Sequence, residues 1–422
     1  MEDNTLIIPS IIGDSPVTTV GQCEGTLPAN TKVIVSEGIT SIVGNAFVGQ
    51  KGLAEIELPA SLEVIDMFAF QSCTNLTSIT FVENSNLKEI KGYALQHTGI
   101  TDVELPTGLE GIGNFVFYNT KIESITIPAS VTTIGAGALS GAKVKEIILE
   151  SNEYFIMENY CLIEKNTGRI IKGLEGIENL NYNYSVSVKI LDEYSLMDIS
   201  TLINVIIPEG VHVIRAYALH SCNNITSISL PSTLLEIQGN AIGSSKLTEI
   251  VIPSSVTKIS QGAFIYSALE NIEIEGGNNE YFKIEGNCLI DIKNKVLIDN
   301  LSNAIIPSDG SVNIRGTGAF MNTDLTSIII PDTITGIQNF VFQHSDLTNI
   351  EITSSVKFIG YNAFASCKYL TNVTLGSTTG WQVKINGTWQ DIPSTYDLSD
   401  GSVVAELLTK TYVGYYWQNI SE

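Results

Sequence analysis

The chain has 422 residues and a formal net charge of −23. This charge argues against nucleic acid or an anionic membrane surface as a partner, because both carry phosphate groups that would be repelled. The sequence has no run of eighteen or more apolar residues, so we expect no membrane insertion. Only 16% of the residues are charged, and this composition favours a secreted or surface protein solvated by neutral polar groups. The first residues, MEDNTLIIPS, lack the basic start and apolar core of an export signal, so either the protein is cytosolic or such a signal lies outside this sequence.

The chain begins with a degenerate copy of a repeat that becomes regular at Thr31. Residues 1–30 contain TLIIP and two later apolar positions, and we expect them to form an N-terminal capping coil. From residue 31 to 375 the apolar residues recur with a period of about 22 or 23 residues. A repeat of this length predicts a solenoid, in which each coil packs only on its neighbours.

The stretch LTSIIIPDTITGIQNFVF, residues 325–342, shows the repeating unit in full. Ile328 and Ile330 are two residues apart in one strand, so both should point into the core, while Ile329 between them points away. Pro331 cannot donate a ladder hydrogen bond and should end the strand. The first half of each coil is therefore predicted to be a short strand with one buried face.

The second half of the unit is predicted to be extended and then to turn. Ile334 and Ile337 belong to a second short strand, and Phe342 should lie on a short helical or 3₁₀ turn, with its ring in the core. One coil buries roughly five apolar side chains, worth about 1.5–3 kcal/mol each, which is too little to offset about 1–2 kcal/mol of ordering per residue. Stacking buries both flat faces of a coil, so we predict a rod of about fourteen coils.

Two related segments interrupt the repeat, at residues 152–174 and 279–301. Their sequences, NEYFIMENYCLIEKNTGRIIKGL and NEYFKIEGNCLIDIKNKVLIDNL, alternate apolar and polar residues around an Asn-rich turn. This pattern predicts one inserted β-hairpin in each segment. Aromatic side chains of the hairpins could stack on sugars, or they could cover the edge of the coil beneath. These aromatic residues are Tyr154, Phe155, Tyr281 and Phe282.

Residues 376–422 differ in composition from the repeats and are predicted to form a C-terminal cap. All three tryptophans of the chain fall there, and Trp buries much area per residue, which suits the closing of an open solenoid end. Asn386-Gly387 lies between strand-like runs and predicts a type I′ hairpin. The run DLSDGSVVAELLTK predicts a short helix with Asp397 or Ser399 near its start.

The coils resemble those of the BspA-like bacterial surface leucine-rich repeats, whose units read LxxIxIPxxVxxIGxxAFxxCxxL. VTTIGAGAL, VTKISQGAF and VKFIGYNAFASCKYL are close matches, and the resemblance covers about residues 31–375. It implies a β-rich repeat solenoid with α/β coils, in the form of a curved right-handed leucine-rich-repeat rod. Two departures from the pattern concern packing: Ser195-Leu196 replaces the Ala-Phe pair, and Arg315 stands where a core isoleucine is expected.

One position of each first strand points away from the core and should line the concave face of the rod. Its apolar members Ile206, Val251 and Ile329 alternate with polar ones in the second half of the chain. Exposed apolar side chains on such a sheet could bind a partner. β-Propensity alone at an exposed strand position is the alternative explanation. The candidate partner-binding residues of this outward column are Glu57, Glu104, Ile148, Ile206, Val251, Glu273, Ile329 and Glu351.

The acidic members of the outward column admit other interpretations. Glu57 and Glu104 lie two coils apart, so their Cα atoms should be about 9.6 Å apart, near the carboxylate separation of an inverting glycosidase. An open sheet offers no pocket to raise one pKa, however, and a solvated acidic patch is the simpler interpretation. Glu55, Glu57, Asp102 and Glu104 together could also hold a calcium ion.

Cysteine and histidine positions give no indication of a cofactor. Cys73, Cys222 and Cys367 share one repeat position and should be about 24–30 Å apart from one to the next, so we expect buried thiols and no disulfide. We expect no near partner either for the other three cysteines, Cys23, Cys161 and Cys288. The four histidines are scattered, and no serine-hydrolase, phosphate-loop, HExxH or paired CxxC motif occurs. We therefore predict no enzymatic activity, no metal and no cofactor.

The family resemblance and the outward column together give the functional hypotheses. The resemblance implies a non-enzymatic cell-surface or secreted protein of a host-associated bacterium, with adhesion or protein binding as its role. The main hypothesis is that the concave sheet, with or without the hairpins, binds a host or extracellular-matrix protein. A glycan-binding surface protein that uses the hairpin aromatics, and a purely structural spacer, are the alternatives.

Overall fold

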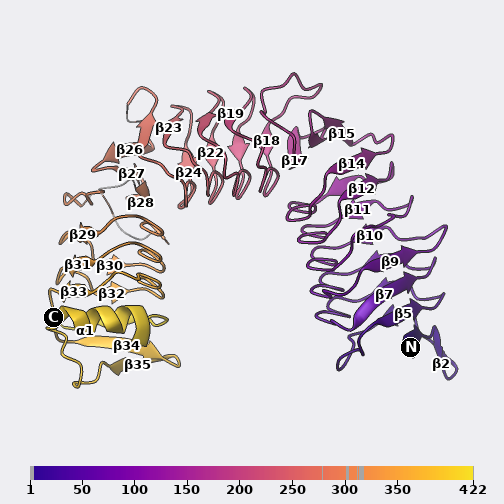
Figure 1. Ribbon diagram of the computed structural model, residues 1–422, viewed down its shortest axis with the longest axis horizontal. Helices are drawn as coiled ribbons and strands as arrows, with labels where there is room; N and C mark the ends of the chain where they lie inside the picture. Colours follow the sequence, from indigo (N-terminus) through magenta and orange to yellow (C-terminus); the bar gives the residue numbers. More distant parts are fainter. Residues whose placement is uncertain (1–3, 278, 301–303, 311, 313–317, 422) are drawn as a thin grey trace. The chain divides into compact units, whose positions relative to one another are not determined.

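The structure is a computed structural model that describes residues 4–277, 279–300, 304–310, 312 and 318–421 (Figure 1). It is a β-solenoid of about sixteen turns over the described residues, with almost no helix, against the fourteen coils expected. The chain divides into two compact units, Met1–Leu202 and Ile203–Glu422. Arg315 and the end of the second inserted segment at Leu301 lie outside the described residues. The predicted division into two caps and a central solenoid rests on repeat content and stays a prediction.

Most coils begin with a first strand that pairs in parallel with the first strand of at least one neighbouring coil. In the first unit these strands are β1 (Thr5–Ile8), β5 (Thr31–Val35), β7 (Leu53–Leu58), β9 (Ser78–Phe81), β12 (Ser124–Ile127) and β14 (Glu146–Leu149). In the second unit they are β19 (Asn204–Ile206), β21 (Ser227–Ser229), β23 (Glu249–Ile252), β25 (Asn271–Ile274), β29 (Ser327–Ile329), β31 (Asn349–Ile352) and β33 (Asn372–Leu375).

A second strand of only two residues follows in most coils. In the first unit these are β4 (Thr19–Val20), β6 (Ser41–Ile42), β8 (Val64–Ile65), β10 (Glu89–Ile90), β11 (Gly111–Ile112), β13 (Thr133–Ile134) and β18 (Ile190–Leu191). In the second unit they are β20 (Val213–Ile214), β22 (Glu236–Ile237), β24 (Lys258–Ile259), β30 (Gly336–Ile337) and β32 (Phe358–Ile359). A short antiparallel pair, β2 (Ile11–Ile12) and β3 (Ser15–Pro16), lies near the start of the chain.

The alternation predicted for the first strand is confirmed in the coil of β29. Ile328 and Ile330 are 6% and 0% exposed, whereas Ile329 between them is 71% exposed. Phe342 is also buried, and its ring stacks on the corresponding phenylalanine of the next coil with centroids 5.2 Å apart. The repeat therefore places one apolar column after another inside the solenoid, as the two-residue spacing requires.

The segment that carries the Ala-Phe pair is a series of tight turns, and the expected helical or 3₁₀ turn is wrong. In the coil of β30, the backbone N–H of Gln343 donates to Phe340 O, while the N–H of Phe342 donates to Ala363 O of the next coil. Successive backbone N–H groups thus donate alternately to carbonyls of the same coil and of the next coil. A helix would not show this pattern, because its N–H groups donate to carbonyls of the same helix. Phe340 and His344 have positive φ angles of 59° at the corners.

The two inserted segments are three-stranded antiparallel meanders and not single hairpins. The first consists of β15 (Phe155–Glu158), β16 (Cys161–Glu164) and β17 (Arg169–Gly173). The second consists of β26 (Phe282–Glu285), β27 (Cys288–Asp291) and β28 (Val296–Asn300). An additional turn forms in the sequence ENYC, residues 158–161, where Asn159 and Tyr160 both have positive φ angles, 48° and 64°. The chain therefore reverses twice within the segment and not once.

The C-terminal segment adds strands to the solenoid end. β34 (Trp381–Ile385) and β35 (Thr388–Asp391) form the hairpin predicted at Asn386-Gly387. The short helix α1 (Gly401–Glu406) lies within the expected run and is capped by Asp400, one residue after Ser399, the later of the two expected starts. It continues as a π-helical turn, η1 (Leu407–Thr411). β36 (Trp417–Asn419) pairs antiparallel with β32 and buries Trp417 over the last coil.

All six cysteines lie in the described residues, and no disulfide bond joins any of them. Cys73, Cys222 and Cys367 are buried, as predicted. Burial raises the pKa of the Cys73 thiol to about 12, and the neighbouring Cys23 also raises it.

Ser195 replaces the usual alanine in a buried corner, and its side chain gives a test of the packing. Ser195 is 0% exposed, and its hydroxyl has no hydrogen-bond partner within the described residues. Ser195→Ala should therefore stabilise the first unit by about 1 kcal/mol, because it removes a buried unsatisfied hydroxyl. Ser140 is the matched control, since its equally buried hydroxyl donates to Tyr194 O at 2.9 Å. Ser140→Ala should lower the free energy of unfolding of the first unit, measured with urea. Stabilisation by both substitutions, or by neither, would contradict this explanation.

Candidate functional site

The outward column of the second unit exposes apolar and acidic side chains in turn. Ile206, Val251 and Ile329 are 41%, 52% and 71% exposed, and all three occupy the same position of their first strands. The strand register places Ser229 beside Ile206, Glu273 beside Val251 and Glu351 beside Ile329. Glu273 and Glu351 are exposed as well. The structure thus places these five predicted residues on the outward face of their sheets; their role in binding stays a prediction.

The outward column of the first unit is less uniform. Ile148 is 49% exposed and lies beside Thr126 in the ladder of β12 and β14. Glu57 lies between Ile34 and Thr80 in the ladder of β5, β7 and β9. Glu104 is exposed, but residues 101–106 form no strand, so the expected ladder position is wrong. The coil before it is two residues longer than usual, and the ladder of first strands stops after β9.

The acidic candidates of the first unit lie apart from one another in their interactions. Glu57 makes an ion pair with Lys32, with 2.5 Å between its Oε1 and the lysine Nζ. No group of three His, Cys, Asp or Glu side chains among the described residues is placed so that it could hold a metal ion. A carboxylate already paired with lysine is a poor calcium ligand, because the ammonium group competes with the cation for the carboxylate oxygens.

A hollow lies beside the outward column at β29. It has a volume of about 730 Å³ and lies between residues 304–308 and residues 324–331. Ile305 and Ile329 are each 71% exposed on its two sides, and Asp324 is the one charged residue in its lining. Ser308, Thr326 and Ser327 add hydroxyl groups. The hollow therefore combines apolar walls with a few polar groups, which is typical of a binding groove.

The aromatic residues of the two meanders divide into exposed and buried members. Tyr154 and Tyr281 are 42% and 38% exposed, whereas Phe155 and Phe282 are each 1% exposed. The two phenylalanines therefore belong to the core and cannot stack on a sugar. Covering the coil beneath, the second of the two expectations, is what the structure shows for them.

A row of aromatic rings in the first unit was not predicted from the sequence. Phe68, Tyr93 and Phe115 occupy equivalent corners of successive coils, with ring centroids 4.9 Å and 5.1 Å apart. All three have positive φ angles, between 54° and 62°, a region that non-glycine residues seldom adopt. Their ring faces contact one another, so the stack offers edges and not faces to the surroundings. Such a row stabilises the corners and does not provide a sugar-stacking platform.

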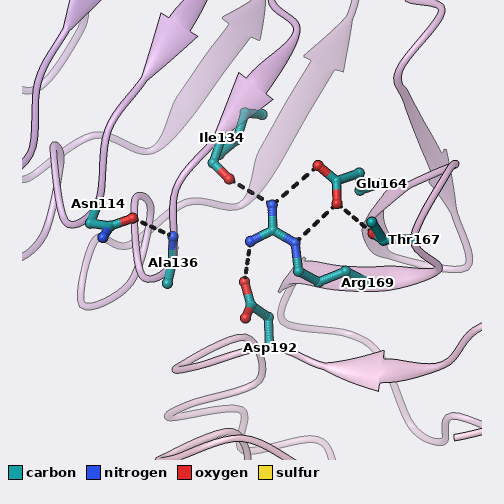
Figure 2. A network of polar contacts seen from close by, with 7 residues as sticks. All are labelled: Asn114, Ile134, Ala136, Glu164, Thr167, Arg169 and Asp192. Carbon is teal, nitrogen blue, oxygen red and sulfur yellow. Dashed lines mark hydrogen bonds and ion pairs between the residues drawn. The ribbon is translucent and has the colours of Figure 1, made fainter. Parts of the chain in front are cut away.

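Figure 2 shows a second feature that the sequence analysis missed, a buried arginine at the first meander. The guanidinium of Arg169 donates to Asp192 Oδ2 at 2.7 Å and to the backbone O of Ile134 at 2.7 Å. It also contacts both carboxylate oxygens of Glu164, at 3.3 and 3.4 Å, and Thr167 donates to the same carboxylate. The side chain of Asp192 is 0% exposed, and that of Arg169 14%. One arginine thus joins the ends of β13, β16 and β18.

Arg169 substitutes for a backbone donor that the insertion removes. In neighbouring coils the carbonyl that ends the second strand accepts from the next coil, as Gly135 N–H to Ile112 O at 2.8 Å shows. The meander follows β14 directly, and Ile134 O accepts from Arg169 instead. The second meander has Val296 at the equivalent position, so a comparison of the two copies is the one sequence signal that could have singled out Arg169.

Among the described residues no helix has the length and apolar character needed to cross a membrane. The crystal structure of the pneumococcal vaccine antigen PcpA is 21% identical, with 83% of this chain and 84% of that chain covered and a TM-score of 0.52. A leucine-rich cell-surface protein from Faecalibacterium prausnitzii is 18% identical, with 89% and 88% covered and a TM-score of 0.49. No curated protein sequence matches the chain.

The repeat itself identifies the family. The model of the BspA-type leucine-rich repeat region matches in six copies, over residues 30–166, 174–289 and 291–382. These ranges include most of the coils and the first two strands of the first meander, whereas β17 lies between two of them. They agree with the repeat that the stacked first strands show. The likeness to PcpA supports the same fold. The chain is therefore a member of the BspA-type leucine-rich repeat family.

Proposed function

We propose that this protein is a cell-surface or secreted binding protein that presents the outward column of its second unit to a host or extracellular-matrix protein. Proteins of this repeat family are in general non-enzymatic scaffolds for protein interactions. The composition, with few charged residues and many neutral polar ones, supports a place outside the cell. The outward column supports the choice of surface.

The observation that carries the proposal is the exposure of Ile206, Val251 and Ile329 at one repeated position. Apolar side chains that face water on a sheet give up hydration when a partner covers them, at about 25 cal/mol per Å² of buried apolar area. Glu273 and Glu351, the register partners of Val251 and Ile329, add negative charge beside these apolar side chains. A protein partner with apolar and basic side chains fits this surface best.

The test replaces the three apolar residues together. Immobilised wild-type protein and the variant Ile206→Ser, Val251→Ser, Ile329→Ser are each incubated with extracellular-matrix and mucus proteins, and the captured proteins are identified by mass spectrometry. We expect the affinity for the captured partner to fall at least tenfold in the variant, because about 1–2 kcal/mol of apolar burial is lost per truncated side chain.

The matched control removes three exposed apolar residues of the same unit that lie outside the column. Ile203, Leu235 and Ile292 are 49%, 43% and 39% exposed, and their replacement by serine should leave the affinity unchanged. Equal binding by the column variant and wild-type protein would refute the proposal. Binding to a glycan array that Tyr154→Ala abolishes would move the function to the first meander instead.

A further inference from the structure

The strand β29 ends its sheet on one side. The sheet has the order β29-β31-β33, so among the described residues β29 pairs with β31 alone. The preceding coil reaches the corresponding position at residues 304–306, which form no strand. The N–H of Ile305 instead donates to Gly286 O at 2.7 Å, toward the second meander. An open strand edge therefore borders the hollow described above.

The ladder identifies which backbone groups face this open edge. Thr326 O accepts from the N–H of Thr348, and the N–H of Ile330 donates to Glu351 O, so both point toward β31. Backbone groups alternate in direction along a strand, and those of Ser327 and Ile329 consequently point the other way. Neither residue has a hydrogen-bond partner on that side within the described residues. Two N–H and two C=O groups are thus directed into the hollow.

The chemistry of this edge selects an extended peptide as the ligand. Alternating backbone donors and acceptors pair with another strand, as in strand addition to a sheet edge. The exposed side chains of Ile305 and Ile329 lie on either side of the hollow, where an added strand would place an apolar side chain. A volume of about 730 Å³ lies within the range of peptide and small-ligand sites.

The charge around the edge favours a basic peptide of a partner protein over a second copy of this chain. Asp324 is the one charged residue in the lining, and Glu351 is the register partner of Ile329. A second copy of this chain would bring the same two carboxylates to the edge and add the repulsion of two chains with a net charge of −23 each. A lysine or arginine in the added strand would instead pair with them.

We propose that the open edge of β29 binds an extended peptide segment of a partner protein, with apolar residues at alternate positions and at least one lysine or arginine. The segment adds a strand beside Ser327 and Ile329. The inference rests on the proposed function in treating this face as a binding surface, and it specifies the mode of binding and the class of ligand.

The test uses phage-displayed random decapeptides selected on the immobilised full chain, and two variants at one position. Ile329→Ala truncates the side chain and keeps the N–H. Ile329→Pro also removes the N–H, which is not part of the ladder with β31, so the sheet remains paired. Circular dichroism and the unfolding midpoint confirm that both variants are folded.

The selected peptides should alternate apolar and polar residues and contain lysine or arginine. Their affinity should fall at least tenfold more in Ile329→Pro than in Ile329→Ala, and N-methylation of alternate peptide amides should reduce it similarly. Equal affinity for both variants, a selected motif without alternation, no enrichment of any peptide, or selection of acidic peptides would each overturn the inference. If peptide selection fails while the triple serine variant loses its protein partner, strand addition is wrong and the proposed function stands. If peptides are selected as expected while the triple serine variant keeps its protein partner, the proposed function is wrong and strand addition stands.

Discussion

Ile328→Asp is expected to lower the unfolding free energy of the second unit by at least about 3 kcal/mol. Truncation of a buried isoleucine costs about 2–5 kcal/mol, and a buried carboxylate without a partner adds to this cost. Ile328 is 6% exposed, and its register partner in β31 is Ile350, which is 2% exposed. The inserted charge would therefore face a column of isoleucines, and the damage should extend to the stacked coils on either side.

Amide hydrogen exchange is the suitable measurement, because a repeat array need not unfold in one step. Peptides that cover β29, β31 and β33 should exchange faster in Ile328→Asp, whereas those from the first unit should not change. Ile329→Asp is the matched control, since Ile329 is 71% exposed and one residue away. Its exchange pattern should equal that of the wild-type protein. Equal destabilisation by both substitutions would show that the inward and outward faces are wrongly assigned.

The second large effect is expected for Arg169→Met. This change keeps much of the side-chain volume and removes the guanidinium from the fully buried carboxylate of Asp192 and from Ile134 O. Loss of one partner of a buried ion pair typically costs about 3–5 kcal/mol. Urea unfolding should show a loss of this size in the first unit. Amides of β15, β16 and β17 should also exchange faster, because the meander loses its attachment to the preceding coil.

A double-mutant cycle separates the ion pair from the backbone contact. The double variant Arg169→Met, Asp192→Asn should be more stable than the sum of the two single effects predicts, because it leaves no buried charge without its partner. Val296→Met in the second meander is the control for the change of shape, and it should cost less than about 1.5 kcal/mol. A loss below about 1 kcal/mol for Arg169→Met would show that Arg169 does not hold the first meander in place.

The sequence is sufficient to predict the core, because the relevant signal is local and repeated. The spacing of Ile328 and Ile330, repeated coil after coil, determines which face of a strand is buried. A register shift of one residue would expose every buried side chain of that strand. The structure confirms this for Ile328, Ile329 and Ile330. The Asn386-Gly387 hairpin was predictable for the same reason, since the turn type depends on two adjacent residues with positive φ.

Features that depend on contacts between distant coils were not predictable. The pattern around Phe342 fits a helical turn equally well, and only the hydrogen bonds between coils decide for a series of tight turns. Arg169 acts through Ile134 and Asp192, which are 35 and 23 residues away in the sequence. The local apolar pattern likewise did not indicate that residues 101–106 would form no strand.

The candidate site was predictable in part. The exposure of Ile206, Val251 and Ile329 follows from the strand alternation, and the structure agrees. The open edge of β29 does not follow from it, because residues 304–306 carry the same apolar pattern as the coils that do pair. The acidic residues Glu57 and Glu104 illustrate the opposite case, in which identical repeat positions have different surroundings: one is paired with Lys32, and the other lies outside any strand.

The division between inward residues that specify the fold and outward residues that bind is tested most directly by one variant measured in two ways. For Ile329→Asp, the unfolding midpoint and the amount of partner bound per folded molecule should be determined on the same preparation. We predict an unchanged midpoint and at least a tenfold loss of affinity, because the new carboxylate adds to the charge of Glu351 at an apolar contact. An unchanged midpoint with unchanged binding would contradict the assignment of function to the outward column.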